Sequence, residues 1–504
     1  MLNAIDPVRG MRDVLPADVQ LQAIVAARID GVLDSYGYEA IDLPVIERRD
    51  LYLRKLGEEL VGKVYEFQFN GRELALRPEW TASVLRAYAS RMVGAPLPLR
   101  LRYSGPVFRN ERPQRHTFRQ FTQIGVELIG GPSPRADAEC MALACAGLDA
   151  AGVSEYRVRV GHIGLIRQLL AASGLTERTQ SVLVWSLERM RKQGVGAVRE
   201  QLAALHGEEP LDTALLENLD DEQAEALLLH SLRSIGVNLR FGTRPPEEIV
   251  GRLVRKLRRG DQQPQVERTL AVLERLSAIH GSPAEALPAV EGLLREHALP
   301  TEAVAELRAT LDLVFAHGVP PGRVVLDMGL GRGLNYYTGL IFEIYSDDDL
   351  QLAGGGRYDD LVMALGGRQP TPAIGFAYGL ERVVAAASVQ PSLGASGQLL
   401  VVALDDAGYR DALQVAQRLR SQGHTVLVDV RGRSAALNMR DAERRGLAGV
   451  VIVEAGDAAR GLVRWRGIHE RDERVIEIEQ LAAFDAARSM NQQANMLPNQ
   501  MPAE

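Results

Sequence analysis

Apolar positions in the first part of the chain follow two different spacings. Between Val19 and Tyr36 they recur every three to four residues, which predicts an amphipathic helix that ends at Gly37. Shorter segments then alternate apolar and polar residues, which predicts strands. These segments cover residues 38–44, 63–69, 74–77, 99–110 and 118–129. Short turns join them and a long helix over 137–151 follows, so we expect a mixed, mostly antiparallel sheet flanked by helices.

The pattern changes after this region. Residues 176–319 are poor in aromatics and rich in Leu, Ala, Glu and Arg, with helical spacing interrupted by glycine and proline, which predicts a helical insertion. Strand spacing returns at 324–328 and 340–345, and a helix is expected over 359–365. The core is therefore expected to comprise residues 1–175 and 320–390.

A separate C-terminal domain is expected after a linker. The linker, residues 390–397, is rich in Pro, Ser and Gly. Beyond it, residues 397–486 alternate strand and helix as a compact α/β domain does. Its expected strands are 399–404, 425–430 and 450–453, and its expected helices are 411–422 and 434–445. The tail, 487–504, is polar and low in complexity, so we expect it to be disordered. The whole chain is predicted to be α+β.

Composition excludes several protein classes. The 504 residues are 46% hydrophobic and 24% charged with a formal net charge of -7, the balance of a globular protein. Two cysteines, Cys140 and Cys145, are too few for a disulfide framework. The N-terminus lacks the apolar core of a signal peptide, and no apolar run reaches the roughly 18 residues of a membrane span. We expect a cytoplasmic protein that is neither exported nor inserted.

Arginines beside carboxylates or glycines indicate a nucleotide site. Arg109 and Glu111 share one face at the end of a predicted strand, where a guanidinium can bind a phosphate and a carboxylate an adenine amino group. Arg332 lies between two glycines, and Arg382 ends the segment 375–382, which is rich in small residues. The alternative readings are a solvated ion pair at the first place and close packing at the others.

Polar side chains also interrupt apolar strand segments. Glu127 follows Gln123 by four residues on one strand face and has isoleucine, valine and leucine neighbours. A buried carboxylate needs a partner, which is either a cationic amino group or small polar ligand, or a structural hydrogen bond to a nearby arginine. Other candidates of this polar group are Glu79, Thr81, Tyr336, Tyr337 and Tyr358. The glycine triplet 354–356 has the composition of a phosphate cradle or of a tight turn.

Motifs in a fixed order resemble the class II aminoacyl-tRNA synthetases, specifically the histidyl-tRNA synthetase family. The resemblance covers nearly all of residues 5–180 and 320–470. Its motifs are Arg9-Gly10-Met11-Arg12-Asp13, Leu76-Arg77-Pro78-Glu79-x-Thr81, Phe108-Arg109-x-Glu111-Arg112-Pro113-Gln114, Arg119-Gln120-Phe121, Gln123-x-Gly125-Val126-Glu127, Arg332-Gly333-Leu334-Asn335-Tyr336-Tyr337, Gly354-Gly355-Gly356-Arg357-Tyr358-Asp359 and Gly375-Phe376-x-x-Gly379-Leu380-Glu381-Arg382. The C-terminal α/β domain resembles the family's anticodon-binding domain, and the implied fold is class II synthetase-like.

The resemblance implies roles at an ATP site. Arg109 would hold the α-phosphate, Glu111 the adenine and Arg382 the γ-phosphate, with Mg²⁺ beside the phosphates. Arg332 would stabilise the charge that develops as the substrate carboxylate attacks the α-phosphorus. Arg332 and Arg109 would thus be the catalytic residues.

The resemblance also implies substrates and partners. The histidine amino group would be bound by Glu79, Thr81 and Gln123, and the imidazole ring by Glu127, Tyr337 and Tyr358. The implied reaction forms histidyl-adenylate from histidine and ATP and then transfers histidine to tRNA(His), with positioning supplying most of the catalysis. A homodimer through the first helix and strand is implied as well.

A non-catalytic relative shares this core. It is the regulatory subunit of ATP phosphoribosyltransferase, a histidine-binding protein of histidine biosynthesis whose partner is the short-form catalytic subunit. Departures from the synthetase pattern that favour it are Trp80 in place of glycine, Arg115-His116-Thr117 in the loop over ATP, Thr122 in place of histidine and Asn335 in place of aspartate. The complete set of ATP-site arginines and the C-terminal domain favour histidine–tRNA ligation, which is our main prediction.

Two basic clusters are candidate tRNA contacts. The first lies in the insertion and the second on a C-terminal helix; they comprise Arg252, Arg255, Lys256, Arg258 and Arg259, and Arg440, Arg444 and Arg445. Phosphate contacts are the usual source of affinity for nucleic acid. A solvated helix surface is the alternative for both clusters, and we favour it.

Overall fold

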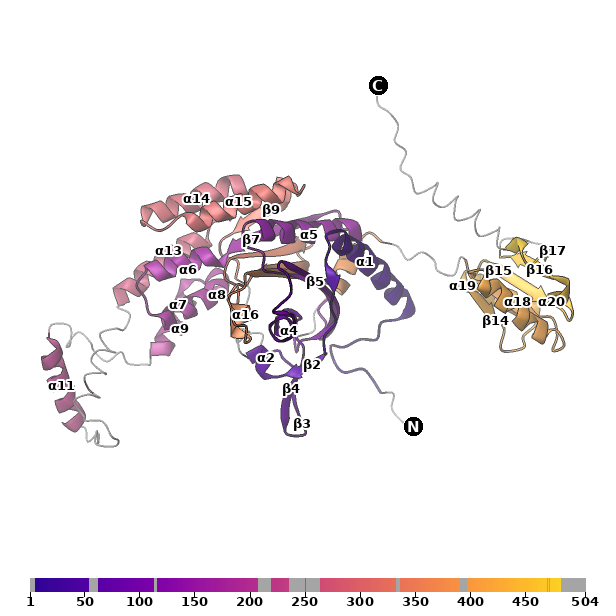
Figure 1. The fold of residues 1–504 in the computed structure, drawn as a ribbon, viewed down its shortest axis with the longest axis horizontal. Helices are drawn as coiled ribbons and strands as arrows, with labels where there is room; N and C mark the ends of the chain where they lie inside the picture. The colour runs from indigo at the N-terminus through magenta and orange to yellow at the C-terminus, as the bar shows by residue number, and fades with distance from the viewer. Residues whose placement is uncertain are drawn as a thin grey trace, which may run out of the picture. The chain divides into compact units, whose positions relative to one another are not determined.

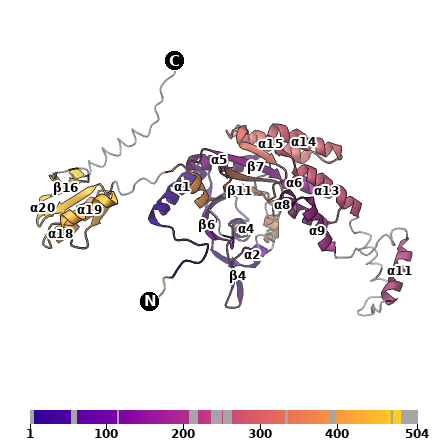
Figure 2. The same ribbon diagram turned by 180° about the vertical axis from the view of Figure 1, so that it is seen from behind.

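The structure is a computed structural model of two compact units, Met1–Val389 and Gln390–Glu504. It describes residues 5–53, 62–112, 116–206, 219–234, 250, 263–331, 336–389, 397–468, 470 and 472–481. The division between the units falls at the start of the predicted linker. Figure 1 and Figure 2 show the elements of each unit from opposite sides.

A nine-stranded sheet forms the centre of the first unit, in the order β1-β5-β6-β12-β11-β10-β7-β9-β8. The strands are β1 (Glu39–Ala40), β5 (Leu99–Phe108), β6 (Gln120–Ile129), β7 (Tyr156–His162), β8 (His280–Gly281), β9 (Val324–Asp327), β10 (Leu340–Ser346), β11 (Gln351–Arg357) and β12 (Ala373–Gly379). Neighbours from β5 to β7 are antiparallel, whereas β1 pairs parallel with β5 and β7 with β9. The predicted mixed, mostly antiparallel sheet is confirmed.

Helices α1 (Pro16–Ser35), α5 (Arg135–Ala151) and α17 (Leu380–Ala386) pack together along one face of this sheet. The apolar stripe predicted for the first helix is buried there at Val25, Ile29 and Leu33. Strand β6 shows why two faces result, because its side chains alternate. Ile124, Val126 and Leu128 belong to the apolar core, while Gln123 and Glu127 point to the opposite face.

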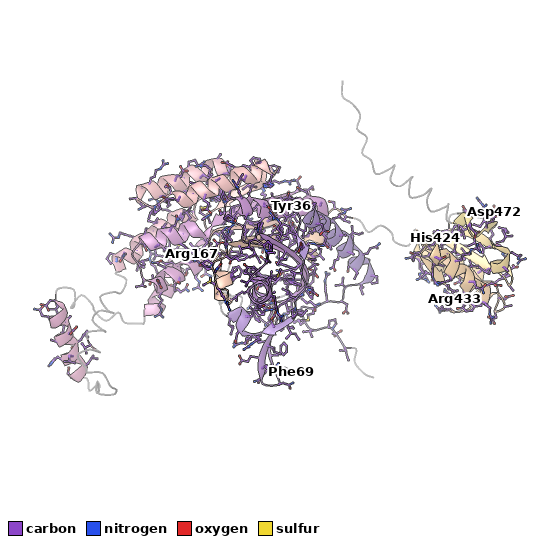
Figure 3. All side chains as sticks on the ribbon, viewed as in Figure 1. Tyr36, Phe69, Arg167, His424, Arg433 and Asp472 are labelled. Carbon is purple, nitrogen blue, oxygen red and sulfur yellow. The ribbon has the colours of Figure 1, made fainter. Side chains whose placement is uncertain are left out.

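The opposite face of the sheet carries α4 (Thr81–Ala87), as Figure 1 and Figure 2 show. Before it come α2 (Asp50–Leu53) and a small sheet of β2 (Ile46–Arg48), β4 (Arg72–Leu76) and β3 (Glu66–Phe69). Phe69 lies at the tip of the β3–β4 hairpin with 62% of its surface exposed (Figure 3). The π-helix η1 (Tyr88–Met92) continues α4.

Helices account for most of the segment between β7 and β9. They are α6 (Ile163–Ala172), α7 (Glu177–Trp185), α8 (Leu187–Gln193), α9 (Val195–His206), α11 (Asp221–Ser234), α13 (Gln263–Ser277), α14 (Pro283–Glu296) and α15 (Glu302–Ala316), with the 3-10 turn η2 (Pro321–Arg323) after them. Within the predicted insertion, β8 pairs with β9 and α15 packs against α5. A two-residue strand is too short to give an alternating pattern, so the sequence did not reveal that this end of the segment joins the sheet.

The C-terminal unit is a five-stranded sheet in the order β14-β13-β15-β16-β17. Its elements are β13 (Leu399–Ala403), α18 (Tyr409–Ser421), β14 (Val426–Val428), α19 (Ala435–Arg445), β15 (Gly449–Val453), α20 (Asp457–Arg460), β16 (Leu462–Gly467) and β17 (Arg474–Glu477). Helices α18 and α19 contribute to two separate apolar clusters of the sheet, and β14, β13 and β15 are parallel. The predicted α/β domain is confirmed.

Four strands of the main sheet, β7, β8, β11 and β12, were absent from our prediction. Strand β7 carries arginines at Arg157 and Arg159, and β12 has the sequence AIGFAYG, in which two glycines dilute the apolar signal. Among the described residues, no helix combines the length and apolar character needed to cross a membrane. The predicted disordered tail lies outside the described residues.

Candidate active site

A pocket of about 170 Å³ opens where β5, β6, β11 and β12 meet α17. Arginines, glutamates, phenylalanines and small residues of β11 and β12 are prominent in its wall. The lining residues are Arg109, Glu111, His116, Thr117, Phe118, Phe121, Gln123, Gln351, Leu352, Ala353, Gly354, Ala377, Gly379, Glu381 and Arg382. The three residues predicted from sequence to bind ATP, among the described part of the chain, therefore line one cavity.

Arg109 and Glu111 reach this pocket from just beyond β5. We had expected them to share a strand face, but the strand ends at Phe108, and a short backbone turn from Glu111 N–H to Arg109 O (2.8 Å) brings them together. The Arg109 Nε donates to the Pro78 carbonyl at 2.8 Å, and the Glu111 carboxylate lies 3.6 Å from Lys63 Nζ. The two residues line the same pocket, but the shared strand face that we expected is not what brings them together.

Arg382 lies in the first turns of α17 and is held by carbonyl and hydroxyl oxygens. Its Nε donates to the His116 carbonyl (3.1 Å), and its two terminal nitrogens donate to the Gln351 carbonyl (3.2 Å) and to Thr117 Oγ1 (3.3 Å). These partners are neutral, so an anionic group would be a stronger partner for the guanidinium. The arrangement suits a cation that receives a phosphate.

A second group of polar residues surrounds Glu127, which is completely buried. Its Oε1 accepts hydrogen bonds from Thr81 Oγ1 (2.7 Å) and the Tyr103 hydroxyl (3.1 Å), and its Oε2 accepts one from the Tyr358 hydroxyl. Burial raises the pKa of Glu127 well above its usual value, opposed by the hydrogen bonds from Thr81 and Tyr103. No arginine of the described chain pairs with it, and its three described partners are all hydroxyls.

Glu79 is a second buried carboxylate beside the first. Both of its oxygens accept the Ala82 N–H, at 3.0 and 3.3 Å, at the first turn of α4. Burial raises the pKa of Glu79, and the hydrogen bonds from Ala82 and Thr81 and the nearby charge of Arg109 oppose the shift. Two buried carboxylates whose described partners are mainly neutral donors favour a cationic ligand.

Aromatic rings close the other side of this buried group. The ring of Tyr336 lies 4.8 Å from that of Tyr337 and 5.7 Å, edge to face, from that of Tyr358. Gly356 leaves room for Tyr337, because a Cβ at this glycine would lie 2.9 Å from the Tyr337 ring. Gly375 likewise leaves room for Glu127, whose Oε2 would be 1.8 Å from a Cβ there. The glycines thus serve close packing around the polar cluster.

Family profiles of known proteins match nearly the whole chain. The profile described as Histidyl-tRNA synthetase matches residues 10–236 and 251–383, and that described as Anticodon binding domain matches residues 398–485. The chain belongs to the histidyl-tRNA synthetase family. One curated relative, the histidine–tRNA ligase of Methanocaldococcus jannaschii, is 30% identical over 486 residues, covering 96% of this chain and all of the relative. That of Pyrococcus furiosus is 28% identical, covering 95% and 98%.

Solved structures of the histidyl-tRNA synthetase family have the same fold. The histidyl-tRNA synthetase of Nostoc sp. PCC 7120 gives a TM-score of 0.65 at 21% identity, covering 97% of this chain and 100% of that chain. An ATP phosphoribosyltransferase regulatory subunit/histidyl-tRNA synthetase of Bacillus halodurans C gives 0.63 at 22% identity, covering 90% and 100%. At these identities the likeness confirms the class II synthetase fold and no finer property.

Trp80, the largest departure from the histidyl-tRNA synthetase pattern, does not line the pocket. It is completely buried, with its ring stacked on Tyr103 at 4.9 Å and 12° and the Arg77 guanidinium 3.5 Å from the ring on which it lies. Its indole Nε1 donates to the Gly105 carbonyl at 3.4 Å. The Trp80 ring therefore packs against one face of Tyr103, whose hydroxyl donates to Glu127. This departure from the family pattern is therefore not among the residues that line the described pocket.

Several predicted residues of this family pattern lie outside the described chain. They are Arg332 and Asn335 in one motif, Arg115 in the loop after β5, and the basic cluster at 252–259. The glycine triplet 354–356 forms part of strand β11 and is not a tight turn. Glycine is needed at 355 because this residue packs against β12 at a distance that leaves no space for a Cβ. In the C-terminal cluster, Arg444 and Arg445 both pair with Asp441.

Tyr103 is a site residue that was not predicted from the sequence. Its hydroxyl is one of three that reach Glu127, and it lies directly opposite Gly125 in the antiparallel pairing of β5 and β6. An aromatic residue facing glycine across a ladder often marks close packing, but the pairing register must be known before that signal can be seen.

Proposed function

We propose that this member of the histidyl-tRNA synthetase family activates histidine with ATP in the two adjoining groups of residues and then passes it to tRNA. The family and its anticodon-binding domain support ligation over the alternative, a non-catalytic regulatory subunit. Ligation proceeds by adenylate formation, in which the histidine carboxylate attacks the α-phosphorus of ATP and pyrophosphate leaves.

The position of Gln123 carries this proposal. Its side chain is 9% exposed, it lines the pocket with Arg109 and Arg382, and it lies four residues before Glu127 on the same face of β6. Its Oε1 accepts no hydrogen bond from any described residue. A buried amide oxygen without a described donor is open to one from a ligand, and we propose that the histidine ammonium supplies it. The amino acid would then lie between the phosphates and Glu127.

On the nucleotide side, we assign Arg109 to the α-phosphate, Glu111 to the adenine amino group and Arg382 to the γ-phosphate. Arg109 donates to the Pro78 carbonyl and Arg382 to the carbonyls of His116 and Gln351, and phosphate oxygens would offer both guanidinium groups charge-assisted bonds. Arg332 would stabilise the transition-state charge, a role that comes from the motif resemblance alone. Arg332 and Arg109 are the proposed catalytic residues.

On the amino-acid side, we assign Glu79, Thr81 and Gln123 to the ammonium group and Glu127, Tyr337 and Tyr358 to the imidazole ring. A carboxylate with two oxygens has about four acceptor positions, and three hydroxyls occupy three of those on Glu127. One position is left for a ring N–H. The hydroxyls hold the carboxylate in place before the substrate arrives, which is the preorganisation that specificity requires.

Magnesium is the implied companion of ATP. No cluster of three or more candidate metal ligands occurs among the described residues, but Mg²⁺ usually takes one or two carboxylates and completes its shell with phosphates and water. Glu381 fits this requirement: it lines the pocket, and its two oxygens both accept the Thr122 N–H at 3.0 Å. We propose that Glu381 contacts the ion, which would neutralise charge on the phosphates.

The tRNA partner follows from the family and its anticodon-binding domain, and tRNA(His) is our proposal for its identity. We also propose a homodimer through the first helix and strand and a cytoplasmic location. Exposed apolar side chains at the start of α1, Leu15 at 64% and Val19 at 49%, support burial of this end against a second copy. Sedimentation of the chain at several concentrations tests the dimer.

Histidine-dependent exchange of radiolabelled pyrophosphate into ATP tests the proposed function. We expect the wild-type chain to catalyse exchange with histidine, and we expect Arg332→Ala to abolish it. Absence of exchange in the wild type, with histidine binding retained in calorimetry, would contradict adenylation and favour the histidine-sensing regulatory role. Charging of tRNA(His) transcript, measured next, tests the transfer step separately.

A further inference from the structure

A buried ion pair lies on the side of the sheet away from the pocket. Arg357 is 3% exposed and Asp137 is completely buried. The Arg357 Nε donates to both oxygens of Asp137, at 2.8 and 3.1 Å, and a terminal nitrogen donates to Asp137 and to the Gly131 carbonyl (3.0 Å). The pair links the last residue of β11 to the first turn of α5. None of the roles assigned above uses either residue.

The strand geometry connects this pair to the proposed ring pocket. Neighbouring residues at the end of a strand point to opposite faces. Arg357 therefore points towards α5, while the next residue, Tyr358, points to the other face and donates its hydroxyl to Glu127. Any rotation or shift of this end of β11 would move both side chains at once.

Backbone bonds extend the connection to the segment that carries Tyr337. The third arm of Arg357, Nη1, donates to Asp359 Oδ1 at 2.8 Å, and that oxygen also accepts the Ala373 N–H at 3.1 Å. Thr338 N–H donates to the Arg357 carbonyl (2.8 Å), and Thr338 Oγ1 accepts the Asp359 N–H (3.0 Å). The residue following Tyr337 is thus fixed to both neighbours of Tyr358.

Stability alone does not explain this arrangement. Removing two charges from water costs several kcal/mol for each ion, and a well-packed apolar pair is often at least as stable. A guanidinium bonded on three sides instead fixes the orientation of its partners, because its planar N–H groups set the angle at which each partner approaches. The described contacts use the three nitrogens of Arg357 to join α5, the segment after β11 and the Gly131 backbone.

We propose that Asp137 and Asp359 are positioning residues which, through Arg357, hold Tyr358 and Tyr337 in the orientation that reads the imidazole ring. The inference rests on the proposed function, since it takes the two tyrosines as ring contacts. It concerns histidine recognition only, because neither aspartate lines the pocket that contains Arg109 and Arg382.

Separate Michaelis constants for the two substrates test the proposal. In the exchange assay, we expect Asp137→Asn to raise the KM for histidine by about tenfold to a hundredfold, the range for a misplaced contact. We expect its KM for ATP to stay within about twofold of the wild type, because ATP contacts are not moved. Asp359→Asn, at a side chain 41% exposed, should fold readily and give the same split with a smaller rise in the histidine KM.

The matched control is Glu139→Gln, two residues along the same helix. Glu139 also pairs with an arginine, accepting from Arg100 Nε and a terminal nitrogen at 2.8 Å each, but no described contact links that pair to Tyr358 or Tyr337. We expect both KM values of this variant to match the wild type within about twofold. A general effect of removing a carboxylate from α5 would appear here as well.

The outcomes separate the two proposals. If the wild type catalyses exchange and both aspartate variants keep a wild-type histidine KM, or raise the two KM values in parallel, the positioning role is wrong. If Asp137→Asn does not fold, Asp359→Asn decides by the same criterion. If the wild type shows no exchange, the adenylation proposal fails, and the dissociation constant for histidine in calorimetry then tests the positioning role by itself.

Discussion

The two halves of the candidate active site are built in different ways. On the proposed nucleotide side, Arg109 and Arg382 extend into an open pocket and donate mostly to backbone carbonyls, at Pro78, His116 and Gln351. On the proposed histidine side, Glu127 is completely buried and its described hydrogen bonds come from side-chain hydroxyls.

This difference fits the demands of the two ligands. A triphosphate carries enough charge to draw guanidinium groups away from neutral carbonyls, so its cations can be held loosely beforehand. An imidazole ring offers only two polar atoms, and a site can reject other side chains only if its own polar groups are already fixed. We therefore expect substitutions on the two sides to change different kinetic constants.

The largest effect is expected at the centre of the histidine side. Glu127→Gln keeps the size of the side chain but replaces an acceptor oxygen with an amide that donates. Three hydroxyls and the substrate ring then compete for a single oxygen, and charged hydrogen bonds contribute about 1.5–3 kcal/mol each. We expect kcat/KM for histidine to fall by about a hundredfold or more in pyrophosphate exchange.

A buried carboxylate in the other unit serves as its control. Asp429 is 7% exposed and accepts the Asn438 side-chain amide at 2.9 Å. Asp429→Asn should leave exchange unchanged, because exchange does not require tRNA. A similar loss of kcat/KM in both variants would point to a general folding defect and would count against a specific role for Glu127.

On the nucleotide side we expect a smaller effect, which changes the constant for ATP and leaves that for histidine unchanged. Arg382→Ala removes one charge-assisted contact to the phosphates, so we expect the KM for ATP to rise by about tenfold to thirtyfold. The calorimetric affinity for histidine should not change. Arg382→Lys keeps the charge but loses the planar guanidinium. Its KM for ATP should lie between those of the wild type and Arg382→Ala. A histidine affinity that drops together with the ATP constant would show that the two halves are not independent.

Trp80, which stacks on Tyr103, should contribute more to stability than to the kinetic constants. Trp80→Phe keeps an aromatic ring against Tyr103 but removes the indole N–H and part of the buried surface. We expect the free energy of unfolding of the first unit to fall by about 1–2 kcal/mol. Chemical denaturation followed by circular dichroism measures it. Trp465→Phe in the C-terminal unit, where Trp465 is 7% exposed, is the comparison. A stability loss equal to that of Trp465→Phe, with an altered histidine KM, would place Trp80 in the binding machinery.

The smallest expected signal is the release of a fraction of a proton when histidine binds. Burial raises the pKa of Glu127, so the free site keeps a proton to higher pH than an exposed glutamate does. A ring N–H or ammonium favours the ionised carboxylate and lowers this pKa, so histidine binding should release a proton. The affinity for histidine should accordingly increase as pH rises through the raised pKa. Calorimetry in buffers of different ionisation enthalpy measures the release, and Glu127→Gln should eliminate that part of it.

Much of the fold was predictable because its signals are local. The first helix and its buried stripe at Val25, Ile29 and Leu33, the strands β5, β6, β9 and β10, and the C-terminal α/β domain all follow from spacing within short windows. The strand β12 was missed because its two glycines weaken the apolar pattern; one of them, Gly375, leaves room for Glu127 and the backbone of β6. The strand β8 was missed because two residues form no period.

The amino-acid sequence by itself determined which chemical groups are present and, through motif order, which family they belong to. It assigned Arg109, Glu111 and Arg382 to one site before any geometry was known, and the pocket confirms that they lie together. Those assignments depend on residue type and order, both of which are written along the chain.

Only the tertiary structure decided where neighbouring residues point. Trp80 lies between two proposed ligand-binding residues yet packs away from the pocket, and Tyr103 joins the site from a strand with no motif of its own. Asp137 and Arg357 meet across 220 positions of sequence. Such contacts depend on strand register and on the packing of helices against the sheet, which arise from the whole set of interactions at once and leave no local pattern.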